Sequence, residues 1–165
     1  MIVKKVILVR HGKSSWADFA LSDHDRPLDE RGKKDAPTMA DLLEQKGHFP
    51  QQIISSTAVR AKTTAQYFGE KFGIAVLQEG DLYHGMPDDY LHQIKNLAPS
   101  INCVALFGHN PGITNLANMV QPGCTDNVPT CGIVVLNLPI ETDWSKASFK
   151  KMTMTDLLYP KDFHA

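Results

Sequence analysis

Apolar residues run without interruption close to the start of the chain. Residues 6–9 read Val-Ile-Leu-Val, with no alternation between apolar and polar positions. A strand with this pattern is buried on both faces, as in the centre of a parallel sheet. Ligands bind beyond the carboxyl ends of such strands, so the Arg10-His11-Gly12 segment that follows is a candidate reaction centre. The glycine is expected to let the backbone turn tightly at this point.

The rest of the chain alternates short apolar runs with segments of helical periodicity. Strands are predicted over residues 4–9, 53–55, 74–77, 103–107, 132–138 and 147–153. Helices are predicted over residues 29–46, 58–71, 87–97 and 112–119. Pro37 falls inside the first helix and is expected to kink or restart it. Strands that alternate with helices form a mostly parallel sheet with both faces covered. The pattern therefore predicts a single domain over residues 1–165, an α/β/α sandwich of three layers.

Composition and charge restrict the function further. The chain has 17 basic and 18 acidic residues and a net charge of −1, which gives no general attraction to nucleic acid or to an anionic membrane. Cys103, Cys124 and Cys131 lack metal-ligand spacing and indicate a reduced, intracellular protein. No apolar stretch has the length of a membrane span or of a signal-peptide core. We therefore expect a cytoplasmic monomer with no nucleic-acid or membrane partner.

Cations and imidazoles follow three of the predicted strands. Arg10 and His11 follow the first strand, and His109 follows the fourth. Arg60 lies in the first turn of the helix after the second strand, where the helix dipole disfavours a cation unless an anion is bound. Two guanidinium groups around one point suit a phosphoryl group.

A neutral imidazole is a competent nucleophile toward phosphorus. The nearby arginines are expected to keep His11 unprotonated by like-charge repulsion, while a carbonyl holds its other ring nitrogen.

Several segments carry a resemblance to a known family. Residues 9–12 (Val-Arg-His-Gly) resemble the nucleophile motif of the histidine phosphatase superfamily, the phosphoglycerate-mutase-like group. Residues 55–61 (Ser-Ser-Thr-Ala-Val-Arg-Ala) resemble its second-arginine motif, and residues 108–112 (Gly-His-Asn-Pro-Gly) resemble its second-histidine motif. Three short segments are similar to the compact SixA-type branch: residues 13–16 (Lys-Ser-Ser-Trp), 26–28 (Arg-Pro-Leu) and 31–32 (Arg-Gly). That branch is named for protein phosphohistidine phosphatase activity.

The resemblance implies a phosphoglycerate-mutase-like fold and a role for each matching residue. His11 would be the nucleophile that becomes phosphohistidine. Arg10, Arg60 and His109 would form the phosphate pocket, with Ser14 as a further contributor. No metal ion or organic cofactor is implied. The implied substrate is a phosphohistidine in a signalling or phosphotransfer protein. Two alternatives stay open: a phosphatase of a small phosphorylated metabolite, and a non-catalytic phosphate-binding module.

The general acid is the point at which the sequence departs from the larger family members. These use a glutamate four residues before a glycine, and here Asp81 stands at that offset, with Glu79 and His84 as alternatives. An ester substrate needs its leaving oxygen protonated, whereas phosphohistidine tolerates a weaker acid. Between Leu82 and Asn102 there is room for little more than one helix, so no large cap is expected over the pocket.

The remaining aromatic residues and histidines are expected to have structural roles. Trp16 and Phe19 are predicted to cover the sheet. The other histidines are predicted to lie at the surface: His24, His48, His84, His92 and His164.

Overall fold

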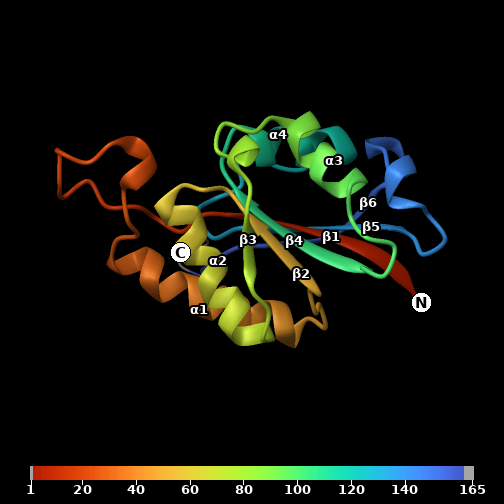
Figure 1. Ribbon diagram of the computed structural model, residues 1–165, viewed down its shortest axis with the longest axis horizontal. Coiled ribbons are helices and arrows are strands. Elements are labelled where there is room, and N and C mark those ends of the chain that lie inside the picture. Colours follow the sequence, from red (N-terminus) through yellow and green to blue (C-terminus); the bar gives the residue numbers. More distant parts are fainter. Residues whose placement is uncertain (1, 162–165) are drawn as a thin grey trace.

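The structure is a computed structural model that describes residues 2–161, and it confirms the alternation of strands and helices (Figure 1). The strands are β1 (Val3–Arg10), β2 (Gln52–Ser55), β3 (Val76–Gln78), β4 (Cys103–Gly108), β5 (Ile133–Pro139) and β6 (Thr153–Leu158). The helices are α1 (Glu30–Gln45), α2 (Val59–Phe72), α3 (Pro87–Lys95) and α4 (Gly112–Val120). Short 3-10 turns are η1 (Asp23–Asp25), η2 (Gly80–Leu82), η3 (Trp144–Lys146) and η4 (Phe149–Lys151).

The strands form one six-stranded sheet in the order β3-β2-β4-β1-β5-β6. β1 pairs in parallel with β4 and antiparallel with β5, so the uninterrupted apolar run lies in the interior of the sheet, as predicted. Its residues Val6, Ile7, Leu8 and Val9 are fully buried. The pairs among β1, β2, β3 and β4 are parallel, and β5 runs antiparallel to both of its neighbours. The mostly parallel sheet is thereby confirmed.

Helices cover both faces of this sheet. Val6 and Leu8 point into a core shared with α3 and α4, whereas Ile7 and Val9 point into a core shared with α1 and α2. Figure 1 shows the two pairs of helices on opposite sides of the strands. The three-layer architecture therefore matches the prediction. The segment between β3 and β4 holds one α-helix, α3, which packs on the sheet and builds no cap over the end of the strands.

The first helix begins as predicted but is not restarted by its proline. Asp29 is the N-cap, and its side chain accepts a hydrogen bond from the backbone N–H of Gly32 at 2.8 Å. Pro37 lies inside α1, which continues as one helix to Gln45. The apolar face of the helix, made of Ala36, Met39, Ala40 and Leu43, is buried against the sheet.

The prediction of a final strand over residues 147–153 is wrong. β6 spans Thr153–Leu158, and the η4 turn occupies part of the predicted range. Ala147 and Met152, two apolar residues of that range, pack beside Trp144 in the core on the α3 side of the sheet. Their burial comes from packing of a connecting segment, and an apolar pattern alone does not distinguish that from a strand.

Candidate active site

The predicted cations and imidazoles meet at the carboxyl edge of three adjacent strands. β2, β4 and β1 are neighbours in the sheet, and the register sets Arg10 opposite Gly108. His11 and His109 therefore leave the sheet side by side, with 5.1 Å between their ring centroids. Arg60 is the second residue of α2, which starts shortly after β2 ends. The predicted convergence of these four side chains is confirmed.

These side chains line one cavity of about 370 Å³. His11, Arg60 and His109 are almost completely buried, with 8%, 7% and 7% of their surfaces exposed. The lining residues are Arg10, His11, Lys13, Ser14, Trp16, Arg26, Arg60, His109, Asn110 and Thr130. Each residue predicted to hold phosphate is among them. The sequence does not single out five of the lining residues as site residues, although all but Thr130 lie in segments that carry the family resemblance: Lys13, Trp16, Arg26, Asn110 and Thr130.

The ring of His11 is prepared to act as a nucleophile. Its Nδ1 lies 2.6 Å from the carbonyl oxygen of Gly12, an acceptor, so Nδ1 carries the proton and Nε2 keeps its lone pair. Burial lowers the pKa of His11 to about 3, with smaller contributions from His109, Arg10 and Arg60. The predicted tautomer and neutral charge follow from this geometry. Removal from water, more than repulsion by the arginines, keeps the imidazole unprotonated.

Gly12 allows close packing and does not make the tight turn that the sequence predicts. Its φ angle is not in the left-handed region, unlike those of Gly47, Gly73 and Gly123. A Cβ on Gly12 would lie 3.0 Å from a methyl group of Leu28 and 3.2 Å from the Cα of Gly32. The nucleophile loop thus rests directly on the start of α1.

Thr64 connects the nucleophile loop to the helix that carries Arg60. The N–H of Gly12 donates to the hydroxyl of Thr64 at 2.9 Å, and this hydroxyl donates to the carbonyl of Arg60 at 2.7 Å. The backbone beside His11 and the first turn of α2 are therefore fixed relative to each other.

Two buried donors at the cavity have no partner within the described residues. The Nη1 of Arg10 donates to the carbonyl of Val128 at 3.0 Å, but its Nε is unpartnered. The Nε2 of His109 lies 2.8 Å from the hydroxyl of Ser56, and its Nδ1 is unpartnered. We assign the Ser56 proton to the hydrogen bond with Nε2, because the hydroxyl has no other acceptor within the described residues; Nδ1 then carries the ring proton. Unpaired buried donors are costly, and an anion in the cavity would satisfy both.

The two neutral histidines predict a fold that weakens in acid. The pKa values of His11 and His109 are about 3, each lowered mainly by burial, against 6.5 for an ordinary histidine. Between those values the unfolded chain binds more protons, so the free energy of unfolding falls as the pH drops below about 6.5. The slope approaches about 1.4 kcal/mol per pH unit for each histidine.

Urea unfolding at a series of pH values measures this slope. A variant with His11→Asn and His109→Asn should lose most of it, whereas His92→Asn, at an exposed position, should keep it. A free energy of unfolding that stays constant from about pH 7 to about pH 5 in the unmodified protein would contradict the assignment.

Arg60 and Arg26 are both tied to Asp23, in the loop between β1 and α1. Arg60 donates from Nη1 to the backbone carbonyl of Asp23 at 2.7 Å and from Nη2 to its carboxylate at 3.0 Å. Arg26 donates to the other carboxylate oxygen at 3.0 Å and also to the hydroxyl of Ser14. Its guanidinium carbon lies 3.4 Å from the centroid of the Trp16 ring. Ser14 is thus at the cavity and held by an arginine.

The general-acid candidates lie in the segment after β3, outside the cavity lining. Asp81 is an exposed residue of η2, and Glu79 precedes that turn and is half-buried. His84 is exposed, with its ring 4.0 Å from that of Tyr83, and its charge helps to lower the pKa of His109 after burial and Arg60. His84 thus acts electrostatically on a cavity side chain, and the role of Asp81 stays a prediction.

Three expectations about aromatic and histidine residues are wrong or need refinement. Trp16 and Phe19 do not cover the sheet: 67% and 93% of their surfaces are exposed, on the loop that projects from the left end of the sheet in Figure 1. His48 is buried, because Lys5 and Asp156 lie at 2.9 Å and 2.7 Å from its ring nitrogens. His24 is half-buried, His84 and His92 are exposed, and His164 lies outside the described residues.

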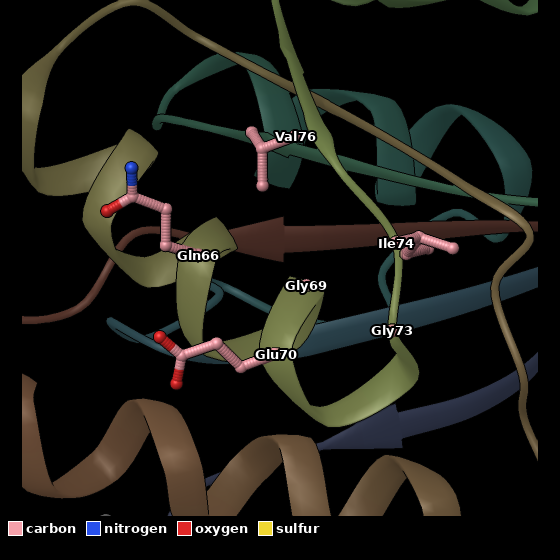
Figure 2. A pocket seen from close by; sticks show the side chains of 6 residues that line it. All are labelled: Gln66, Gly69, Glu70, Gly73, Ile74 and Val76. Carbon is pink, nitrogen blue, oxygen red and sulfur yellow. The ribbon is translucent and has the colours of Figure 1, made fainter.

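A second hollow, of about 500 Å³, lies at the far end of α2 from Arg60 (Figure 2). Glu70 is the titratable residue in its lining, beside Gln66 and the start of β3. The described residues of its lining include no arginine, lysine or histidine, so this hollow lacks the cations that gather in the cavity at the strand ends. Within residues 2–161, no helix is long and apolar enough to cross a membrane, and no three His, Cys, Asp or Glu side chains are grouped to hold a metal.

Comparisons with known proteins agree with this geometry. The model of the histidine phosphatase superfamily (branch 1) matches residues 6–84, a span that contains both Arg10-His11-Gly12 and Arg60. An uncharacterized chloroplastic protein of Arabidopsis thaliana is 31% identical over 163 residues, which cover 88% of this chain and 71% of that protein. The chain belongs to the histidine phosphatase superfamily.

Solved structures place this histidine phosphatase beside the SixA type. A candidate phosphohistidine phosphatase SixA from Agrobacterium tumefaciens superposes with a TM-score of 0.81 and is 29% identical, with 95% of this chain and 98% of that chain covered. The structure of a protein histidine phosphatase SixA complexed with tungstate has a TM-score of 0.73 over 96% of this chain and 99% of the other; its 20% identity supports the shared fold alone. The predicted family and fold are confirmed.

Proposed function

We propose that this histidine phosphatase removes phosphate from phosphohistidine in another protein, through a phosphohistidine intermediate on His11. The observation that carries the proposal is the unprotonated Nε2 of His11, whose ring is held through Nδ1 by the Gly12 carbonyl inside a cavity lined by Arg10, Arg26 and Arg60. A lone pair on nitrogen and several guanidinium groups are what phosphoryl transfer requires, because the protein's task is to position the nucleophile and offset charge on the phosphoryl oxygens.

The reaction has two steps. In the first, Nε2 of His11 attacks phosphorus as the bond from phosphorus to the substrate nitrogen breaks. A substrate imidazole that carries a proton on its other nitrogen leaves as neutral imidazole and needs no strong acid from the enzyme. In the second step, water attacks phosphorus, the bond to Nε2 breaks, and the electron pair returns to His11. The proton of the water leaves with phosphate or solvent. Arg10, Arg60 and the Nδ1–H of His109 hold the phosphoryl oxygens in both steps.

Three features favour a protein substrate over a small metabolite. The strand ends carry no cap, so a side chain presented by another protein can reach the cavity. Trp16, which lines the cavity, and Phe19, on the same loop, expose large apolar surfaces, which are typical of a surface that contacts another protein. The similar Agrobacterium protein is itself described as a candidate phosphohistidine phosphatase.

Turnover of a phosphohistidine protein, compared with sugar phosphates and p-nitrophenyl phosphate, tests the proposal. We expect the highest kcat/KM with the phosphohistidine protein. Faster turnover of a sugar phosphate would favour the metabolite phosphatase instead. Binding of phosphate with no turnover of any substrate would favour a non-catalytic phosphate-binding module.

The general acid can be assigned with leaving groups of different basicity. If Asp81 donates the proton, Asp81→Asn should lower kcat about tenfold to a hundredfold with an alkyl phosphate and much less with p-nitrophenyl phosphate, whose leaving group needs little protonation. Glu79→Gln and His84→Asn are assayed in parallel, and Asp88→Asn, an exposed position in α3, is the control. Equal losses with both substrates would contradict a general-acid role for the residue concerned.

A further inference from the structure

Asp23 occupies an unusual place for an acidic residue, between two arginines of an anion-binding cavity. One carboxylate oxygen accepts from Arg26 at 3.0 Å. The other accepts from Arg60 at 3.0 Å and from the hydroxyl of Tyr83 at 2.5 Å. Its backbone carbonyl accepts a further hydrogen bond from Arg60 at 2.7 Å. All of its acceptor groups are thereby engaged by the cavity's cations or by the tyrosine next to them.

These contacts leave Asp23 charged and outside the reaction. The hydrogen bond from Tyr83, followed by those from Arg60, lowers its pKa to about 2, so it is a carboxylate at neutral pH and has no proton to give. It is not part of the cavity lining, and its side chain is half exposed. A negative charge beside the cavity also opposes the entry of phosphate. Its position therefore calls for a role other than contact with substrate.

We propose that Asp23 is a positioning residue that fixes Arg60 and Arg26 in the orientation that binds the phosphoryl group. Arginine side chains lose considerable rotamer freedom when they bind, and a guanidinium held beforehand binds with a smaller loss. Two hydrogen bonds from Arg60 to Asp23 fix the plane of its guanidinium. The shared carboxylate then sets the separation between Arg60 and Arg26, and each keeps further N–H groups for the ligand.

Neighbouring contacts anchor the Asp23 turn itself. The Nε2 of His24 lies 2.8 Å from the hydroxyl oxygen of Thr57. The His24 ring packs edge-on against the ring of Tyr83, with 4.8 Å between the ring centroids. Tyr83 in turn contacts the ring of His109 edge-on at 5.6 Å. The η1 turn is thus attached to the loop before α2 and to the segment after β3. Asp23 links the loop after β1 to the two other segments that border the cavity.

The test compares Asp23→Asn and Asp23→Ala with Asp25→Asn, which makes the same change of charge at an exposed position in the same turn. The inference rests on the proposed phosphatase activity, so tungstate binding is measured by calorimetry beside the kinetics with p-nitrophenyl phosphate. Because positioned arginines hold the phosphoryl group equally before and during reaction, both Asp23 variants should raise KM and the tungstate Kd about tenfold while kcat changes less than about threefold. Asp23→Glu should recover part of the affinity, and Asp25→Asn should match the unmodified protein.

The outcomes separate positioning from simple charge or folding effects. Removal of a negative charge alone would tighten tungstate binding, and that result would overturn the inference. Loss of folded protein is distinguished from positioning because it would lower kcat at constant KM. If the Asp23 variants do not fold, Tyr83→Phe decides, because it removes one hydrogen bond to Asp23 and keeps every charge. A raised tungstate Kd in that variant supports positioning, and an unchanged Kd overturns it. A protein whose tungstate Kd depends on Asp23 but which turns over no substrate would refute the proposed function and leave the positioning role intact.

Discussion

Replacement of His11 by asparagine is expected to lower kcat for p-nitrophenyl phosphate by about 10⁴-fold or more, because the reaction loses its nucleophile. Asparagine approaches the size of the imidazole but has no lone pair on nitrogen suited to attack phosphorus. The unmodified protein, quenched during turnover of a labelled substrate, should yield a phosphoenzyme that is labile in acid and stable in alkali. The His11→Asn variant should yield none.

The control for this loss is His92→Asn, which removes an exposed histidine on α3 and should leave both kcat and the phosphoenzyme unchanged. Tungstate binding is measured in the His11 variant to verify that the cavity is still formed. A His11→Asn protein that keeps its activity, or that still forms the phosphoenzyme, would exclude His11 as the nucleophile.

Replacement of Arg60 by alanine is expected to reduce kcat/KM by about 10²-fold to 10³-fold, because the phosphoryl group loses charge-assisted hydrogen bonds worth about 1.5–3 kcal/mol each. Arg60 is buried at the start of α2, a helix that begins without a side-chain cap, so its guanidinium and the helix terminus favour an anion at the same place. Arg60→Lys should recover little, since a lysine cannot reproduce the two-pronged geometry of a guanidinium.

Lys62→Ala serves as the matched control, because it removes the same charge two residues further along the helix, at a residue that does not line the cavity. We expect its kcat/KM to stay within about twofold of the unmodified value, since half-exposed charges contribute little through water. Equal losses in the Arg60 and Lys62 variants would mean that α2 contributes through its overall charge and that Arg60 has no specific role.

The sequence was sufficient for the parts of the site that lie on regular elements. The buried run before Arg10 predicts a central strand, and strand ends at one edge of a parallel sheet bring His11, Arg60 and His109 together. Both steps depend on hydrophobic pattern and topology, which local sequence encodes well. The sequence did not reveal which carbonyl holds the ring of His11; the structure shows that it is that of Gly12.

The parts that the sequence did not reveal depend on side-chain contacts between distant loops. Asp23 and Arg26 lie in a loop without periodicity, and this loop contacts the segment after β3. The contact is made by Tyr83, which is 60 residues after Asp23 in the sequence. Trp16 and Phe19 are apolar, and a pattern cannot distinguish an apolar residue that fills a core from one that borders a binding site.

The predictions of a strand over residues 147–153 and of a surface position for His48 are wrong for related reasons. In the first case, a connecting segment supplies apolar side chains to the core. In the latter, a histidine is buried because Lys5 and Asp156, far away in sequence, satisfy both ring nitrogens.

The unpartnered Nε of Arg10 and Nδ1 of His109 also bear on product release. Inorganic phosphate, the product of hydrolysis, presents the same oxygens to these donors as the transferred group does. Accumulated phosphate should therefore compete with substrate and slow turnover, and it should raise the melting temperature as its concentration exceeds its dissociation constant. The catalyst would then be most active, and least resistant to heat, in a cell that is short of phosphate.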